Sequence, residues 1–420
     1  MNTHSKSQKV KKINSRTMIV AVDIGKGFHV GYFRAPNGEE QKPFLFSSSA
    51  KSFHQFWGKV REFSQQHGLD QIIVGFESSG PYAEPLFHYL RKKPINLVQV
   101  NPVHTKRIKE LTGNSPNKTD RKDPRVIADV ICLGHALTLV VPEGPAAHLR
   151  RLTQARERAI KKRTATLNQL QDSIFIIFPE FLKIMKGIST KTAFRLIERC
   201  PIPEDMVSLG LESLSKLIHT ESRGKLGQQR AEELFHAAQR CVGVREGRES
   251  MLMEIEYLVS QISADNKFIA RVEEQMKKHL EEIPYAQSIL SIKGIGKVTA
   301  AGLIGEVGDF RAFRTISEIT KLAGFDLFEI SSGKHMGQRR ISKRGRPLMR
   351  KLLFYAGINV VKRNGILHEP YQQMVSGGKP KLKALVAMAR KLLRIIFALA
   401  RDNTVYVEDY CCNQHLKLAA

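Results

Sequence analysis

The chain has 420 residues and a mass of 47.4 kDa, which is enough for two or three domains with buried cores. Apolar residues make up 42% and charged residues 25%, a composition that excludes a mainly disordered chain and a fibrous one. No run of about 18 apolar residues is present, and the short apolar run after the basic N-terminus stops at Asp23. We therefore expect no membrane span and no signal peptide.

Lysine and arginine number 67 against 40 acidic residues, and the formal net charge is +27. This excess favours a polyanionic partner, because basic side chains that neutralise phosphates release condensed counterions. A ribosome-like or membrane-surface protein is the alternative. Nucleic acid is favoured because the basic residues cluster between apolar-periodic segments rather than on one amphipathic helix. The cysteines at 132, 200, 241, 411 and 412 lack metal-binding spacing and are expected to be reduced thiols in the cytoplasm.

The first third of the chain is predicted to form an α/β domain. Residues 1–17 hold five basic side chains and no acid, which predicts a disordered basic arm. Three meandering strands are then followed by helix, strand, helix, strand and two helices, an order typical of the RNase H-like fold. The strands are expected at 18–23, 28–33, from 43 to 46, 72–76 and 97–100, and the helices at 52–67, 83–92, 102–112 and 119–137.

Residues 141–285 are predicted to be a helical linker region. Two apolar stripes at three-and-four spacing, in 149–177 and 252–276, indicate antiparallel or intermolecular coiled-coil packing. A broken helical insert is expected between them at 186–227. Beyond about residue 145 the pattern predicts no strands.

Residues 286–420 are predicted to form a mainly helical domain. SIKGIG at 291–296 resembles the hairpin of a helix-hairpin-helix, whose glycines let backbone amides approach a phosphate; a small-residue turn between packed helices is the alternative. The segment 334–351 then holds eight lysines or arginines and no acid, and a basic helix with an apolar face follows from Lys379.

Four carboxylates stand at the ends of elements in the α/β domain. Asp23 ends the first strand, Glu77 ends the fourth in GFESSG, and Asp120 and Asp123 lie one helical turn apart in KTDRKD. An RNase H-like fold would bring the four together, and such a cluster needs Mg²⁺ (or Mn²⁺) to neutralise it. Solvated cap or turn residues are the alternative for each acid. VDIGKG also fits an actin-like ATPase, but the second phosphate loop of that fold is not found.

A serine lies just before the cationic run, in ISSGKHMGQRRISKRGRPLMR. Guanidinium groups near Ser332 would hold a phosphate and stabilise the charge that develops during nucleophilic attack. Spacing alone favours the other interpretation, a Ser-Gly turn beside a patch that binds the DNA backbone. The residues predicted to bind nucleic acid are Lys118, Arg121, Lys122, Lys293, Lys297, Lys334, Arg339, Arg340, Lys343, Arg344, Arg346 and Arg350.

Together these segments resemble one family, the DEDD transposases of bacterial insertion sequences. These are bridge-RNA-guided serine recombinases, to which Piv-type DNA invertases are similar. The matching segments include VDIGKG, GFESSGPY, NKTDRKDPRVIAD, SIKGIGKVTAAGLIGEVGDFRAF, SSGKHMGQRRISKRGRPLMRKLLF and ALVAMARKLLRIIFALA, and they run from about residue 18 to 406. Pro124 stands where the family has alanine, and Arg346-Pro347 replaces a small polar pair.

The resemblance implies a RuvC-like domain at 18–140, a coiled coil at 141–285 and a serine-bearing transposase domain at 286–420. The family's acids map onto Asp23, Glu77, Asp120 and Asp123, and its nucleophile onto Ser332, or less well onto Ser331. It further implies donor and target DNA, a structured non-coding guide RNA, a dimer or tetramer, and a bacterial cytoplasmic location on the nucleoid. Strand cleavage would form a phosphoserine link, so religation needs no ATP. The competing class is a metal-dependent junction nuclease that uses water, and a third is a non-catalytic nucleic-acid scaffold.

Overall fold

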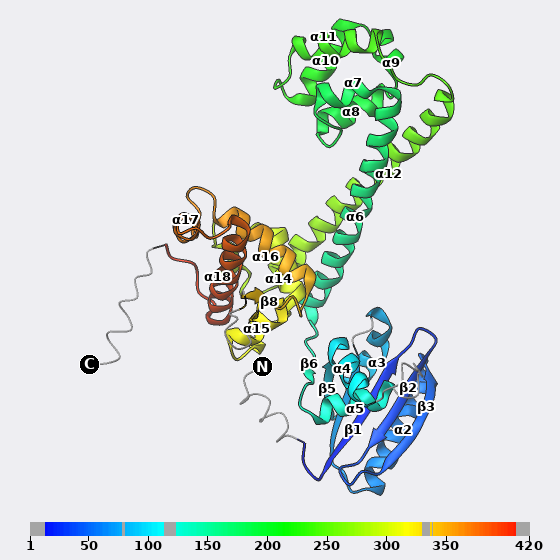
Figure 1. Cartoon of the computed structure of the whole chain (residues 1–420), viewed down its shortest axis with the longest axis vertical. Coiled ribbons are helices and arrows are strands. Elements are labelled where there is room, and N and C mark those ends of the chain that lie inside the picture. The colour runs from blue at the N-terminus through cyan, green and yellow to red at the C-terminus, as the bar shows by residue number, and fades with distance from the viewer. Residues whose placement is uncertain (1–12, 78–79, 113–122, 330–336, 338, 409–420) are drawn as a thin grey trace, which may run out of the picture. The chain divides into compact units, whose positions relative to one another are not determined.

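The chain divides into two compact units, residues 1–140 and 141–420 (Figure 1). None of the helices among the described residues is both long and apolar enough to cross a lipid bilayer. The residues that the computed structural model describes are 13–77, 80–112, 123–329, 337 and 339–408.

Unit 1 is built on a mixed six-stranded sheet in the order β3-β2-β1-β4-β5-β6. Strands β1, β4 and β5 are parallel, whereas β2, β3 and β6 run antiparallel to their neighbours. The predicted succession of elements is confirmed. The strands are β1 Thr17–Ile24, β2 Phe28–Arg34, β3 Glu40–Ser47, β4 Gln71–Glu77, β5 Asn96–Val100 and β6 Leu137–Thr138. The helices are α2 Ala50–Gln66, the 3-10 turn η1 Gly80–Ala83, α3 Glu84–Leu90, α4 Pro102–Thr112 and α5 Asp123–Cys132.

Helices cover both faces of this sheet. On one face Phe33 of β2 packs against Phe56 of α2, with ring centroids 5.9 Å apart. On the other face Ile19, Ala21 and Ile73 join the apolar side of α5 in one buried cluster. A strand that is buried on both faces has apolar residues at successive positions, and this explains the uninterrupted apolar run in β1.

Two predictions for unit 1 are wrong in part. The last helix ends at Cys132 and not at 137, because Gly134 adopts a left-handed backbone (φ 71°) and turns the chain back. Leu137 and Thr138 then pair with β5 as a sixth strand. Residues 13–17 of the predicted disordered arm have a defined structure, in which the Thr17 hydroxyl donates to Asn14 Oδ1 and Thr17 begins β1. Residues 1–12 lie outside the described residues.

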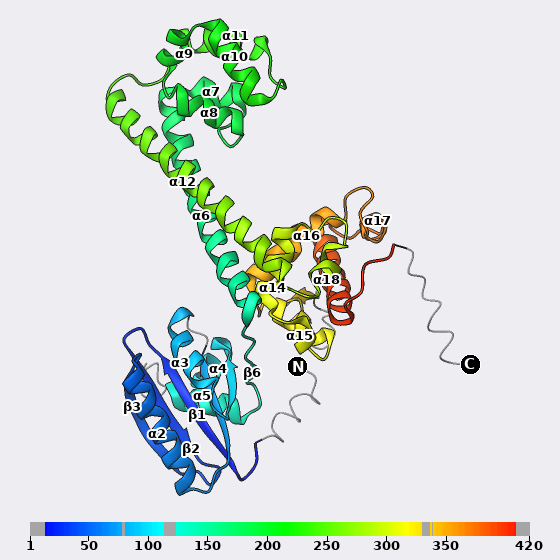
Figure 2. The same ribbon diagram turned by 180° about the vertical axis from the view of Figure 1, so that it is seen from behind.

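Unit 2 begins with two long helices that pack side by side, α6 Gly144–Ile177 and α12 Arg248–Glu281 (Figure 2). Arg156 bonds to Glu273 at 2.7 Å and Lys162 to Gln261 at 2.8 Å, so the helices run antiparallel within one chain. Of the two coiled-coil packings predicted, the structure contains the antiparallel one. The chain between them forms α7 Pro179–Met185, α8 Lys191–Arg199, α9 Pro203–Leu209, α10 Leu211–Ser222 and α11 Gln228–Gln239, which share one buried core with the ends of α6 and α12.

The rest of unit 2 packs against the other end of this helix pair. Gly305 of α14 makes the contact possible, because a Cβ there would lie 2.6 Å from the backbone nitrogen of Arg150 in α6. The elements are α13 Ala286–Leu290, α14 Lys297–Val307, the 3-10 turn η2 Phe310–Ala312, α15 Ile316–Ala323, β7 Leu327–Phe328, β8 Arg340–Ile341, α16 Pro347–Val360, α17 His368–Ser376 and α18 Lys381–Asp402.

The prediction of no strands after residue 145 is wrong, because β7 and β8 pair as a short antiparallel ribbon. Each is two residues long, and a strand of that length has no alternating pattern that a sequence could reveal.

Candidate active site

Asp23 and Glu77 lie next to each other at the carboxyl ends of two adjacent strands. Val22 of β1 pairs with Phe76 of the parallel strand β4, and the two acids are the next residues on their strands. Side chains alternate along a strand, so Asp23 shares the face of Ile19 and Ala21, and Glu77 shares the face of Ile73. That face is the one covered by α5. Both side chains are half-buried.

Helix α4 makes contacts with two of the four predicted acids. The hydroxyl of Thr105 donates to Glu77 Oε2 at 2.8 Å, and the ammonium of Lys109 forms an ion pair with Asp123. Thr105 and Lys109 are four residues apart and therefore lie one above the other on the same side of the helix. Neither residue was predicted from the sequence, although a hydroxyl and an ammonium four residues apart on the helix after β5 are a signal that could have indicated them.

Helix α5 carries Asp123 at its first turn. Asp129 farther along α5 pairs with Arg34 at 2.6 Å, and Arg34 lies opposite Ile19 in the amino-terminal half of β1. The helix therefore runs back along β1 and begins toward the edge that carries Asp23. Gly75 of β4 permits this close packing, because a Cβ there would come within 2.4 Å of Ile131 Cδ1.

The carboxylates of Asp23 and Glu77 fit a hard divalent cation such as Mg²⁺, which prefers oxygen ligands. In the described part of the chain, no group of three or more His, Cys, Asp or Glu side chains is close enough to hold a metal ion. Asp23 and Glu77 end adjacent strands and Asp123 pairs with Lys109, so the cluster of four acids stays a prediction. Asp120 lies outside the described residues.

The predicted nucleophile also lies outside the described residues, as do Ser331, Lys118, Arg121, Lys122 and Lys334. Of the described cations, Arg339, Arg340, Lys343 and Arg344 are exposed around β8. Arg339 Nε pairs with Glu329 at 2.9 Å, so this run already has one acidic partner.

Arg346 and Arg350 lie deeper than the other cations. Arg346 donates to the carbonyl oxygen of Glu306, and Arg350 Nη1 donates to that of Ala323 at 2.9 Å. Burial, aided by the nearby charge of Arg150, lowers the pKa of Arg346 to about 10, so the guanidinium still carries its charge at neutral pH. Both arginines bind the backbone of unit 2, a role in stability that their place in a cationic run did not predict.

The turn at 291–296 joins α13 to α14 and exposes Lys293 and Lys297. Gly294 has φ 105° and faces Val360 of α16, where a Cβ would lie 3.3 Å from Val360 Cγ1. Gly296 has open space around its Cα. Gly294 thus serves the packing of α16, and the phosphate-binding role of the turn stays a prediction.

Comparison with known proteins defines the class of protein. A family model described as a transposase, of the DEDD type from IS110 elements, matches residues 20–179. A second, described as the transposase IS116/IS110/IS902 family, matches residues 286–372. The first model spans most of the α/β unit and all of α6, and the second spans α13 to α17 up to residue 372. The chain is a DNA transposase.

Relatives extend the likeness over most of the chain. A 43.6 kDa protein of insertion element IS110 from Streptomyces coelicolor is 23% identical over 392 residues, 93% of this chain and 95% of that protein. A 44.8 kDa protein of IS116 from Streptomyces clavuligerus is also 23% identical, over 92% of this chain and 95% of its own length. The pilin gene-inverting protein of Moraxella lacunata is 31% identical over 29% of this chain and 39% of that protein. These matches support assignment to the IS110 family.

Proposed function

We propose that this transposase cleaves and rejoins DNA strands through a serine nucleophile, Ser332, assisted by a divalent cation at the carboxylates. The observation that carries the proposal is the pair of acids, Asp23 and Glu77, at the same edge of two adjacent parallel strands. Two carboxylates held side by side repel each other, and a cation between them removes that cost. The proposed fold of unit 1 is RNase H-like and RuvC-like, which the order of the strands supports.

Asp23 and Glu77 would hold the metal, with Asp120 and Asp123 as the further ligands. Bound Mg²⁺ or Mn²⁺ would polarise the phosphate and stabilise the oxygen that leaves. Thr105 positions the Glu77 carboxylate through its 2.8 Å hydrogen bond. Lys109 balances the charge of Asp123 until that carboxylate becomes a ligand.

The covalent step conserves the phosphodiester. As the bond from Ser332 Oγ to phosphorus forms, the bond from phosphorus to one deoxyribose oxygen breaks, and the serine proton passes to the departing oxygen. Reversal of the step by another strand end restores the DNA and frees the serine. Exposed cations at 339–344 would bind the phosphates on either side.

The wider setting is part of the same proposal. A structured non-coding RNA would specify donor and target DNA, and a dimer or tetramer would assemble composite sites in the bacterial cytoplasm, on nucleoid DNA. The resemblance of the motifs to guided recombinases supports these points. The antiparallel helix pair α6 and α12 offers an extended surface for such assembly.

A trapping experiment tests the serine. A nicked substrate that cannot religate should accumulate a protein–DNA adduct that survives denaturation and maps to Ser332. Ser332→Ala should form no adduct and still bind DNA, because a hydroxyl adds little to a site rich in arginine. Ser331→Ala is the matched control and should form the adduct normally. Cleavage that persists in the double alanine variant would overturn the proposal in favour of a nuclease that uses water at the carboxylates.

A further inference from the structure

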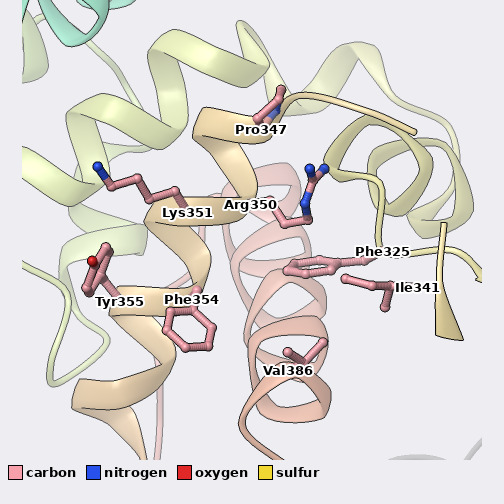
Figure 3. A pocket seen from close by; sticks show the side chains of 8 residues that line it. All are labelled: Phe325, Ile341, Pro347, Arg350, Lys351, Phe354, Tyr355 and Val386. Atoms are coloured by element: carbon pink, nitrogen blue, oxygen red, sulfur yellow. The ribbon is translucent and has the colours of Figure 1, made fainter. Parts of the chain in front are cut away.

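An open cavity of about 390 Å³ lies in unit 2, where α16, α18, β8 and the end of α15 meet. The rings of Phe325, Phe354 and Tyr355 contribute to its wall (Figure 3). The volume falls in the range of about 300–1,000 Å³ that is typical of sites for small ligands. The proposed cleavage mechanism assigns this cavity no role.

One side of α16 forms most of the wall. Pro347, Arg350, Lys351 and Phe354 follow the three-and-four spacing that places side chains on the same side of a helix, and Tyr355 lies beside them. Tyr355 leaves 55% of its surface exposed, and its ring lies 6.0 Å from that of Phe354 at an angle of 78°. The wall therefore presents aromatic surface to solvent.

The opposite wall is apolar. It consists of Phe325, Ile341 of β8 and Val386 of α18, and Figure 3 shows these side chains around the same space as Phe354. Among the described residues, no carboxylate or amide side chain lines the cavity. Such a wall suits a flat group that can stack on a ring and that needs no hydrogen bond from a side chain oxygen.

Two cations line the cavity, and others lie close to it in the chain. Arg350 belongs to the wall, and its Nη1 donates a hydrogen bond to the carbonyl oxygen of Ala323. Arg340 precedes Ile341 directly, and Lys343 and Arg344 follow it on the exposed surface. Lys351 contributes less, because both carboxylate oxygens of Glu157 bond to its Nζ, at 2.7 and 2.9 Å.

Aromatic rings beside a cationic rim are the arrangement by which proteins bind single strands of nucleic acid, since bases stack on the rings and phosphates contact the cations. We propose that this cavity holds one unstacked base of the DNA strand that the enzyme exchanges. The inference rests on the proposed function, in which strand exchange removes bases from the duplex. DNA is favoured over RNA because the chain is a DNA transposase, and DNA strands are therefore its substrates.

Binding of the full-length protein to two probes of equal length tests the site. One probe is oligothymidylate, and the other is a fully abasic strand with the same phosphates. Stacking of a base on an aromatic side chain contributes about 1–3 kcal/mol. Tyr355→Ala should therefore weaken oligothymidylate binding by at least about fivefold and leave binding of the abasic strand unchanged. Tyr355→Phe keeps the ring and should bind oligothymidylate with the wild-type affinity.

The matched control is Tyr257→Ala, because Tyr257 is similarly exposed (61%) on α12 and far along the chain from the cavity. Phe354→Leu keeps an apolar side chain without the aromatic ring and should also weaken oligothymidylate binding alone. Equal losses for the two probes, or none, would overturn the inference. The inference would also be overturned if Tyr355→Ala changed the oligomeric state or lowered the melting temperature but kept oligothymidylate binding. A second copy of the chain, or another segment of the same chain, would then fill the cavity.

A third probe, oligouridylate, distinguishes DNA from RNA. A larger loss for oligouridylate than for oligothymidylate in Tyr355→Ala would assign the cavity to RNA and contradict the inference. Failure here is separable from failure of the proposed function. The Ser332 adduct can form in an enzyme that has no base site, and the adduct experiment measures it independently.

Discussion

The two charged regions of this transposase are built in opposite ways. The carboxylates of unit 1 are placed by regular structure, because the β1–β4 register sets Asp23 beside Glu77 and α4 supplies Thr105 and Lys109. The cations of unit 2 lie mostly on an exposed stretch around a two-residue strand, β8. A metal ion requires ligands in defined positions, whereas attraction to phosphates acts over several ångströms and tolerates variation in position.

The largest effect is expected at the carboxylates of unit 1. Asp23→Asn should abolish strand cleavage in Mg²⁺, because the substitution removes a charged ligand and leaves the side chain's shape. DNA binding should remain nearly intact, since the basic surface is unchanged. Asp70→Asn is the matched control, because Asp70 is an exposed acid that pairs with Arg16. Cleavage at the wild-type rate by Asp23→Asn would mean that the acids are structural.

The contribution of the exposed cations to DNA affinity should depend on salt concentration and little on their exact positions. Replacement of Arg339, Arg340, Lys343 and Arg344 by glutamine should lower the slope of log affinity against log salt by about 0.9 for each lost duplex contact. Affinity measured over a series of salt concentrations gives this slope. An unchanged slope would show that the run does not face DNA.

A variant with equal loss of charge separates local contact from net charge. Lys216, Arg223, Lys225 and Arg240 are exposed cations of the segment between α6 and α12. Their replacement by glutamine should alter the slope much less, because the proposed DNA contacts lie elsewhere.

The close packing of α5 on the sheet gives the next prediction. Gly75→Ala should lower the free energy of unfolding by about 1–3 kcal/mol, because the added Cβ would meet Ile131 and Val98. Gly58→Ala, in the open interior of α2, should instead raise it by about 0.5–1 kcal/mol. Urea denaturation measures both values. Equal stability of the two variants would contradict the assigned contact of α5 with β4.

The smallest effect concerns the partner of Asp123. Lys109→Met should strengthen Mn²⁺ binding by up to about fivefold, because the ion pair that competes with the metal for Asp123 is lost. Lys106→Met is the control, since Lys106 is exposed one residue after Thr105. Weaker Mn²⁺ binding in Lys109→Met would mean that Lys109 orders the site and does not compete for it.

The sheet could be predicted because burial leaves a strong pattern. The uninterrupted apolar run 18–22 and the helical spacing of Phe53, Phe56 and Val60 are visible without coordinates. The strand β6 could not be predicted, because two residues carry no period and its pairing with β5 depends on a turn at Gly134. Sequence distance also hid the α4 contacts, since Thr105 lies 28 residues after its partner Glu77.

The acids and cations differ in how far sequence could resolve their roles. Asp23 and Glu77 were predicted from strand ends, and the parallel pairing of β1 and β4 places them together. Arg346 and Arg350 look like Arg344 in the sequence, yet they bond to the carbonyls of Glu306 and Ala323. Arg346 and Arg350 differ from the exposed cations in being half-buried. Which residues of a short polar segment are buried depends on tertiary packing, which the local sequence does not reveal.

Binding of Mn²⁺ to the full-length protein without DNA, followed by electron paramagnetic resonance, tests the central claim most directly. The wild-type protein should bind Mn²⁺, and Mg²⁺ should displace the bound Mn²⁺. Asp23→Asn and Glu77→Gln should each lose Mn²⁺ binding, whereas Asp70→Asn should keep it. Undiminished binding in the Asp23→Asn, Glu77→Gln double variant would contradict the assignment of a metal site to the ends of β1 and β4.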